Sequence, residues 1–336
     1  MQGNDLSNVK RQHYVPQFLL RGFADDDEKL SVFTRGEGLS FRASPKDVAC
    51  QRYYNAAKLE SGEIDTQTIE RELSQIEDSG SSAIRALLSG AKPTAEQREA
   101  FALFLTSQDF RSPRRRQEYA DMLLGIEHHK FGRDTVKSVE SFVLAVTQAS
   151  ERSDELDVTK LSDKSELRVE ADGTISMSIE ATIWSLSAAK HFAPVVSEMN
   201  WHLFRAPRGK SFITSDSPVQ LYESPETLEK FNGPAYWRQG SYISFPLTSD
   251  ACFLASHRSR SNGVTLPPHF SVREAKSSDV HFFNQLQLAG CLNQIYATSD
   301  YSWLHKKCAD LPKRKSNLSF MPVNADGSRI SVVAKR

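Results

Sequence analysis

Polar side chains suited to proton transfer and anion binding flank the first apolar segment of the chain, KRQHYVPQFLLRGFA at residues 10–24. His13 precedes the apolar residues, and an imidazole with a pKa near neutrality can take or give a proton. Gln17 and Arg21 are four residues apart, so they share one face of a short helix. We expect His13 to act as general acid or base, Arg21 to hold an anion and Gln17 to position it. The alternative is a structural histidine, the more common role for a single imidazole.

A second set of polar residues continues the apolar face of a predicted helix. Phe101 and Leu105 lie on this face, and helical spacing extends it to Gln108 and Arg111. A guanidinium group matches pairs of phosphate oxygens, so we expect Arg111 to hold a substrate anion and Gln108 to position it. Three more arginines follow at residues 114–116. Two alternatives stay open: Gln108 caps a backbone group, and the arginines form a solvated helix start.

The third polar set ends an apolar strand in SFITSDSPV, residues 211–219. Thr214, Ser215 and Asp216 occupy the strand end, and polar side chains at such positions are common in active sites. We expect Asp216 to orient His13 or to bind a metal ion, and Thr214 and Ser215 to contact the substrate. The alternative is an ordinary turn, because Asp and Ser cap turns through their own side chains.

Asn284 lies on the apolar stripe of a helix predicted over residues 277–298. Leu288, Cys291 and Ile295 follow it at the fourth, seventh and eleventh positions. Asparagine is a poor helix former and is costly in a core, so we expect Asn284 to bind the substrate or a neighbouring polar group. A hydrogen bond to backbone is the alternative.

Two carboxylates, Glu70 and Glu77, lie seven residues apart beside the apolar stripe of a predicted helix. Together with Asp216 they would offer oxygen ligands to a divalent cation. A solvated helix flank is the more common role for such residues. We therefore assign no metal ligands, and the cofactor stays unknown.

The spacing of apolar residues predicts an α+β fold with a mixed or mainly antiparallel sheet and a helical layer. We expect residues 1–12 to form a flexible tail and residues 13–336 to form a single domain. A mainly helical block is predicted at about residues 64–150. The remaining helices are expected at residues 16–22, 180–199 and 277–298, and strands at residues 30–35, 241–247, 251–256 and 330–335.

Two hairpins are predicted in the second half of the chain. Apolar alternation on both sides of Asp172 and Gly173 indicates the first, because Asp-Gly is a common hairpin turn. The second is expected to join residues 201–206 to residues 211–214 through the turn PRGK.

The overall composition excludes several classes of protein. The 42 basic and 42 acidic residues balance, which argues against a protein that coats nucleic acid or a membrane surface. The four scattered cysteines lack zinc-ligand spacing and suit a reducing compartment, with two disulfides in a secreted protein as the alternative. The polar start and the lack of a long apolar run favour a cytoplasmic protein without a membrane span. Phosphate-loop, dinucleotide-binding, zinc-protease and serine-hydrolase motifs are absent.

Several of these segments occur in the order typical of one family. They are HYVPQFLLRGF, QDFRSP, WHLF with FITSDSPV, FPL, and FNQLQLAGCLNQIY. Over residues 11–300 the chain resembles the mostly bacterial family called domain of unknown function 4238. The pattern His-x-Val-Pro-x-Phe matches at His13, Gln-x-x-Arg-Ser-Pro at Gln108, and Thr-Ser-Asp-x-Pro at Thr214, with Ser217 where the family often has Asn. The resemblance implies no reaction. The polar residues found by periodicity coincide with its motif positions, and Asn284 matches a late helical Asn, which favours one common site.

We therefore expect an enzyme acting on a phosphate-containing substrate, with a nuclease-like phosphodiester hydrolase favoured. Fixed cationic and amide donors around an anion would stabilise the charge that develops in such a reaction. The alternative is a non-catalytic module, a sensor or toxin-like effector that binds a nucleotide or RNA. A polar network that only fixes the fold is the third interpretation. The expected partner is nucleic acid or a nucleotide, and protein partners stay unknown.

Overall fold

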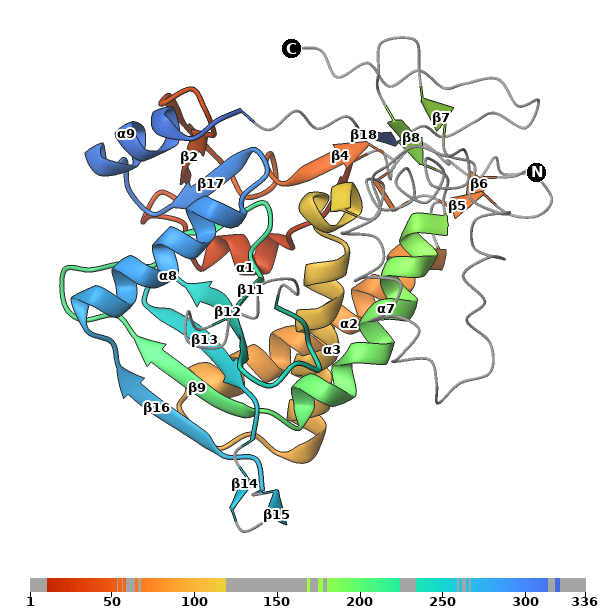
Figure 1. Cartoon of the computed structure of the whole chain (residues 1–336). Helices are drawn as coiled ribbons and strands as arrows, with labels where there is room; N and C mark the ends of the chain where they lie inside the picture. The colour runs from red at the N-terminus through yellow and green to blue at the C-terminus, as the bar shows by residue number, and fades with distance from the viewer. Residues whose placement is uncertain are drawn as a thin grey trace, which may run out of the picture.

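The larger sheet of the protein is a five-stranded mixed sheet in the computed structural model (Figure 1). Its strand order is β11 (Gln220–Glu223), β12 (Ser241–Thr248), β13 (Ala251–Ser256), β9 (Asn200–Arg205) and β16 (Phe270–Glu274). Neighbouring strands are antiparallel except β16, which runs parallel to β9. The structure describes residues 11–52, 54–55, 57–58, 64–65, 68–118, 168–169, 175–177, 180–223, 234–258, 260–261, 264–265, 267–313 and 318–320.

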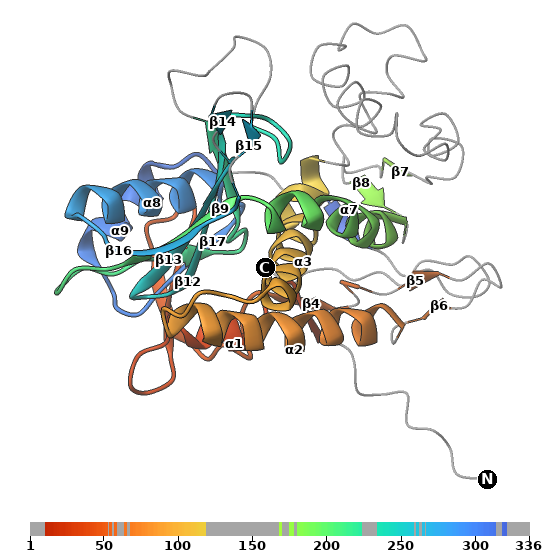
Figure 2. The same ribbon diagram turned by 90° about the horizontal axis from the view of Figure 1, so that it is seen from below.

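Helices cover both faces of this sheet. Successive side chains of a strand point to opposite faces, so one strand contacts both helical layers. On β9, Trp201 packs against Phe101 of α3 (Ala95–Phe110), with ring centroids 5.2 Å apart. Phe204 of the same strand packs instead against Phe283 of α8 (Ser277–Gly290), at 5.4 Å. Figure 2 shows α8 on one side of the sheet, with α2 (Thr68–Leu88), α3 and α7 (Glu180–Ser197) on the other. The expected α+β fold with a helical layer is therefore confirmed.

Helix α3 is the central member of the helical layer. It begins after Thr94, whose hydroxyl accepts from the Gln97 amide while the Gln97 side chain accepts from the Thr94 amide. From Phe101 onward the helix is almost entirely buried, because α2, α7 and the sheet surround it. Helix α2 packs tightly against it at Gly80, where a Cβ atom would lie 2.4 Å from Cγ of Phe104. A larger residue would therefore push the two helices apart.

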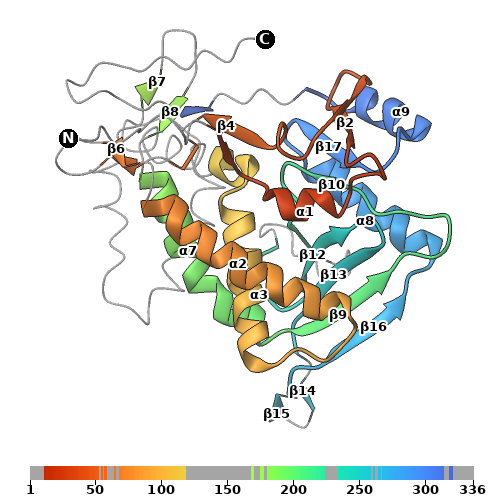
Figure 3. The same cartoon turned by 180° about the vertical axis from the view of Figure 1, so that it is seen from behind.

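A second sheet pairs early strands of the chain with later ones. Its order is β10 (Thr214–Ser215), β17 (Gln294–Ala297), β2 (Leu30–Thr34) and β3 (Ser40–Ala43), and every pair is antiparallel. The short helix α1 (Gln17–Arg21) precedes β2, and α9 (Ser302–Asp310) follows β17. Figure 3 shows this sheet beside α1, next to the larger sheet.

The remaining strands form small groups. Strand β1 (Arg11–His13) pairs with β4 (Cys50–Arg52), β5 (Ala57–Lys58) with β6 (Ile64–Asp65), and β14 (Arg260–Ser261) with β15 (Val264–Thr265). In a three-stranded group, β8 (Ile175–Met177) pairs antiparallel with β7 (Arg168–Val169) and parallel with β18 (Leu318–Phe320). The antiparallel β7–β8 pair agrees with the first predicted hairpin, whose turn at Asp172 and Gly173 lies outside the described residues.

The second predicted hairpin is wrong. Residues 200–205 form β9 and pair with β13 and β16, whereas residues 214–215 form β10 and pair with β17 in the other sheet. Between them, the amides of Ala206 and Phe212 donate to the carbonyls of Asp250 and Ser249. The segment therefore crosses the end of the β12–β13 hairpin and passes from one sheet to the other.

The predicted helix over residues 277–298 is too long. Helix α8 ends at Gly290, Cys291 has extended backbone angles, and Ile295 belongs to β17. The cause is Asp216, whose carboxylate accepts hydrogen bonds from the amides of residues 292–294 and holds them in a turn. Ile295 is therefore buried as a residue of β17 in the second sheet and not as part of the helix.

Other expectations concern parts of the chain outside the described residues. Residues 113–118 are helical, and the rest of the helix predicted at 114–149 lies outside them, as does the strand predicted at 330–335. Among the described helices, none has the length and apolar character needed to cross a bilayer.

Candidate functional site

The end of α3 carries a buried ion pair with a glutamine beside it. Nη1 of Arg111 lies 2.6 Å from Oε1 of Glu77 on α2, and its Nη2 donates to Oε1 of Gln108 at 2.8 Å. The Gln108 amide nitrogen donates to the Tyr14 carbonyl at 2.7 Å, which ties α3 to the segment between β1 and α1. The Arg111 side chain is 3% exposed and that of Glu77 27%. The pair therefore reaches the surface through its carboxylate.

A second buried arginine extends this network. The guanidinium of Arg116 lies over the Tyr54 ring, 3.6 Å from its centroid, and donates to Oδ1 of Asn55 at 3.0 Å. Nδ2 of Asn55 donates to Glu70 at 2.7 Å. Burial raises the pKa of Tyr54 to about 12, so its phenol stays protonated and donates to the Arg111 carbonyl at 2.7 Å. The two arginines are thus joined through Tyr54.

His13 lies at the edge of the same network. Its ring is partly buried, and its Nε2 atom is fully buried without a hydrogen-bond partner among the described residues. Burial lowers the pKa of His13, although backbone hydrogen bonds at Lys46 and Pro45 and the charge of Glu77 oppose this effect. The imidazole is therefore neutral at neutral pH, with a ring nitrogen that no described group uses.

Asp216 is buried and bound by backbone. Its carboxylate accepts from the amides of Leu292, Asn293 and Gln294 at 2.8, 2.6 and 3.0 Å. Burial raises the pKa of Asp216, and the three amides oppose this shift. Within the described ranges no hydrogen bond joins Asp216 to His13, so the expected orienting contact is not part of this arrangement. The carboxylate instead fixes the turn that begins β17.

The polar residues of α8 hold the loop that contains Asp216. Asn284 accepts from the Ile213 amide and donates to the Ser211 carbonyl, both at 3.0 Å. Gln287 accepts from the Ser215 hydroxyl at 2.8 Å and donates to the Pro218 carbonyl at 2.8 Å. These contacts satisfy both buried side-chain amides and explain why Asn284 lies on the apolar stripe. The hydroxyl of Thr214 is buried without a hydrogen-bond partner in the part of the chain described here.

Gln17 and Arg21 lie apart from this network. Arg21 is exposed on α1 and donates to the Gln17 side chain at 3.3 Å, which confirms that the two share a helix face. Their only described side-chain hydrogen bond is this mutual one. The structure thus brings together His13, Gln108 and Arg111 and leaves Gln17 and Arg21 at the surface. Thr214 and Ser215 lie in the adjoining strand β10, Asp216 directly follows them, and Asn284 lies in α8.

The three carboxylates that could offer oxygen ligands to a divalent cation have separate partners. Glu70 binds Asn55, Glu77 binds Arg111, and Asp216 binds backbone amides. No group of three or more metal-binding side chains with suitable geometry occurs within the described ranges.

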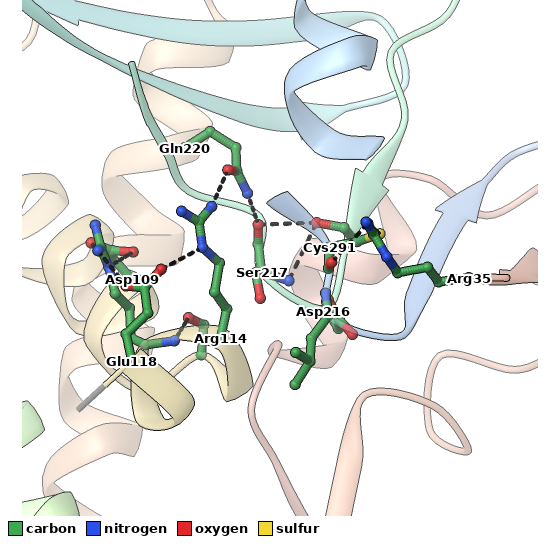
Figure 4. A network of polar contacts seen from close by, with 12 residues as sticks. Arg35, Asp109, Arg114, Glu118, Asp216, Ser217, Gln220 and Cys291 are labelled. Carbon is green, nitrogen blue, oxygen red and sulfur yellow. Dashed lines mark hydrogen bonds and ion pairs between the residues drawn. The ribbon is translucent and has the colours of Figure 1, made fainter. Parts of the chain in front are cut away.

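Sequence reasoning missed the link between the arginines at 114–116 and the rest of the network. Arg114 donates to Glu118 at 2.7 Å and to Oε1 of Gln220 at 2.9 Å, and the Gln220 amide donates to the Ser217 carbonyl. Figure 4 shows Gln220 between Arg114 and Ser217. A Cβ atom at Gly290 would collide with the Gln220 side chain, so this glycine keeps the space open. No local signal identifies Gln220, because its partner is about one hundred residues away.

The comparisons with known proteins agree with the sequence motifs. The model of one family, described as "Protein of unknown function (DUF4238)", matches residues 11–301. Neither the curated proteins nor the solved structures include a significant match to the chain. The match begins at the strand that carries His13 and extends beyond β17, so it covers all residues of the network.

Proposed function

Because the chain belongs to the DUF4238 family, whose description names no reaction, we propose a function from the geometry alone: an enzyme acting on a phosphate-containing substrate. A phosphodiester hydrolase of the nuclease type is the favoured activity. His13 would transfer the proton, and Arg111 would bind the anion.

The observation that carries this proposal is the state of His13. A general base must be unprotonated at the working pH and must have a nitrogen free to accept a proton. The lowered pKa satisfies the first condition, and the unpartnered Nε2 satisfies the second within the described residues. A buried nitrogen without a partner costs about 1–3 kcal/mol, so a functional reason for it is expected.

The Arg111–Glu77 pair supports the anion-binding part. The guanidinium is already neutralised by a carboxylate that is partly exposed, and a phosphate group that takes the place of this carboxylate would find a positioned donor fork. Gln108 and the Tyr54 contact hold the arginine during the exchange. Substitution Glu77→Gln removes the competing charge and should strengthen binding of inorganic phosphate.

The test is hydrolysis of a model phosphodiester and of short DNA and RNA, with and without added divalent cations. We expect His13→Ala to lower the rate by at least about 100-fold, the usual contribution of a general base. His281→Ala is the matched control, because that histidine is exposed on α8. Wild-type protein that cleaves none of these substrates, or a His13→Ala variant as fast as the control, would overturn the proposal.

Ligand binding without turnover is the second candidate, and the position of Asp216 favours it. A catalytic imidazole is commonly oriented by a carboxylate, but Asp216 is occupied by backbone amides. A sensor or effector would need the arginines to bind its ligand, but it would not need a carboxylate to orient His13. In that case His13→Ala should weaken phosphate binding only slightly, whereas Arg111→Lys, which keeps the charge and loses the fork, should weaken it strongly.

A further inference from the structure

We propose that Trp237 and Arg115 form a binding site for a nucleotide, with the base stacked on the indole and a phosphate on the guanidinium. This inference rests on the proposed action on phosphate-containing molecules and names the chemical class of the substrate.

The first observation is a stack of aromatic rings that ends at an exposed tryptophan. Phe192 of α7 stacks on Phe110 at the end of α3, with centroids 5.5 Å apart and an interplanar angle of 14°. Phe192 also stacks with Tyr236 at 5.2 Å and with Trp237 at 5.3 Å, at angles of 19° and 26°. Tyr236 is buried, whereas Trp237 is 40% exposed. The stack on Phe192 therefore fixes the orientation of the indole ring, and part of the Trp237 residue stays exposed to solvent.

The second observation is a guanidinium linked to this stack. The Tyr236 hydroxyl donates to Oδ2 of Asp109 at 2.7 Å, and Nε of Arg115 lies 2.9 Å from Oδ1 of the same carboxylate. Nη1 of Arg115 binds Glu118 at 2.7 Å. These contacts use Nε and Nη1, and within the described part of the chain they leave Nη2 to meet a ligand. The Arg115 side chain is 24% exposed, so we expect an anion from solvent to reach its guanidinium at Nη2.

The two features together specify a ligand with a flat ring and a negative charge. Aromatic side chains stack on any nucleobase, and a guanidinium nitrogen donates charge-assisted hydrogen bonds to phosphate oxygens. Asp109 is buried and bonds to both Tyr236 and Arg115, so one carboxylate links the guanidinium to the ring stack that ends at Trp237. A ligand with only one of the two groups would use half of the site.

The inference is tested by calorimetric titration of the full chain with adenosine monophosphate, with adenosine and with ribose 5-phosphate. We expect the nucleotide to bind at least tenfold more tightly than either half. Trp237→Leu should weaken nucleotide binding by about 5- to 100-fold, since base stacking contributes that much, and Trp237→Phe should restore most of it. The matched control is Trp303→Leu, because Trp303 is 39% exposed and lies elsewhere, on α9.

A phosphorylated oligonucleotide titrated in parallel separates the two sources of the ligand. Tighter binding of the oligonucleotide indicates the end of a strand, and tighter binding of the monophosphate indicates a free nucleotide. Either result supports the site. Equal affinity for adenosine monophosphate and ribose 5-phosphate, or equal losses for Trp237→Leu and Trp303→Leu, would overturn it.

Failure of the proposed hydrolysis is distinguishable from failure of this site. If nucleotide binding depends on Trp237 but no phosphodiester is cleaved, the inference stands and the hydrolase proposal fails. If cleavage depends on His13 while Trp237→Leu changes neither nucleotide binding nor the rate, the hydrolase proposal stands. The nucleotide site at Trp237 is then wrong.

Discussion

The hydrogen-bond partners of buried polar side chains distinguish structural residues from candidate functional ones. Asn284 binds backbone with its amide group, and Gln287 binds the Ser215 hydroxyl and the Pro218 carbonyl. Asp216 accepts from backbone amides with both carboxylate oxygens. Such residues connect elements and leave nothing for a ligand. His13 differs because one ring nitrogen is left over within the described residues. It is therefore the strongest candidate for chemistry in the network.

The structural role of Asn284 predicts a loss of stability. Asn284→Ala leaves the Ile213 amide and the Ser211 carbonyl without their partner, and each unsatisfied buried group costs about 1–3 kcal/mol. We expect the free energy of unfolding to fall by about 2–4 kcal/mol in urea denaturation. His281→Ala, at an exposed position on the same helix, should change it by less than about 0.5 kcal/mol. Equal free energies of unfolding for the two variants would show that the Asn284 hydrogen bonds to Ile213 and Ser211 do not stabilise the protein.

At the scale of elements, close packing makes some small residues indispensable. Replacing an exposed helical glycine by alanine normally stabilises a helix by about 1 kcal/mol. At Gly80 the new methyl group would meet the Phe104 ring. We expect Gly80→Ala to lower the melting temperature, because overpacking of a core costs about 1–3 kcal/mol. Ser82→Ala, exposed on α2, should raise it slightly; a rise for both would contradict the tight crossing of α2 and α3.

The β9–β16 pair carries a prediction about pH. His202 on β9 bonds to the Ser271 hydroxyl on β16 at 2.8 Å, and burial, with smaller effects from Arg273 and His269, lowers its pKa to about 4. An unfolded histidine titrates near 6.5, so between these values the unfolded chain binds a proton that the native protein lacks. Stability should therefore fall as the pH drops from about 6.5 to 4, by at most about 3 kcal/mol from this group.

Urea denaturation at pH 7.0 and 4.5 checks this expectation. His202→Gln keeps a group that can bond to Ser271 but cannot titrate in this range. We expect the variant to lose less stability than the wild type on acidification. Identical losses would mean that His202 does not contribute to the acid sensitivity of the sheet.

Local patterns predicted the elements whose ends are set locally. The Thr94 cap places the start of α3, and the alternation of Trp201 and Phe204 between two cores matches a strand between two helical layers. The second hairpin and the end of α8 were wrong because bonds distant in sequence set them, the latter from Asp216. In the site, helical spacing found Gln108 and Arg111, and the run of arginines at residues 114–116 drew attention to Arg116 without indicating that it is buried. No local pattern indicates Tyr54 or Gln220.

At the scale of the whole molecule, the second sheet joins strands from early and late parts of the chain. Strand β2 lies between β3 and β17, and β17 also holds β10. A chain that ends at residue 290 would lack β17 and leave both β2 and β10 without this partner. We expect it to show no cooperative unfolding transition by circular dichroism, whereas a chain that ends at residue 313 should keep one. A cooperative transition in the shorter chain would show that the larger sheet folds independently.

The place of β2 beside β17 also has a consequence for synthesis in the cell. The apolar residues 30–34 leave the ribosome long before residues 294–297 are translated. During that time one side of β2 has no native strand to pair with, and an unpaired apolar strand is prone to aggregate. Slow translation or a shortage of chaperones should therefore harm the yield of this protein more than that of a protein whose strands pair with their neighbours in sequence.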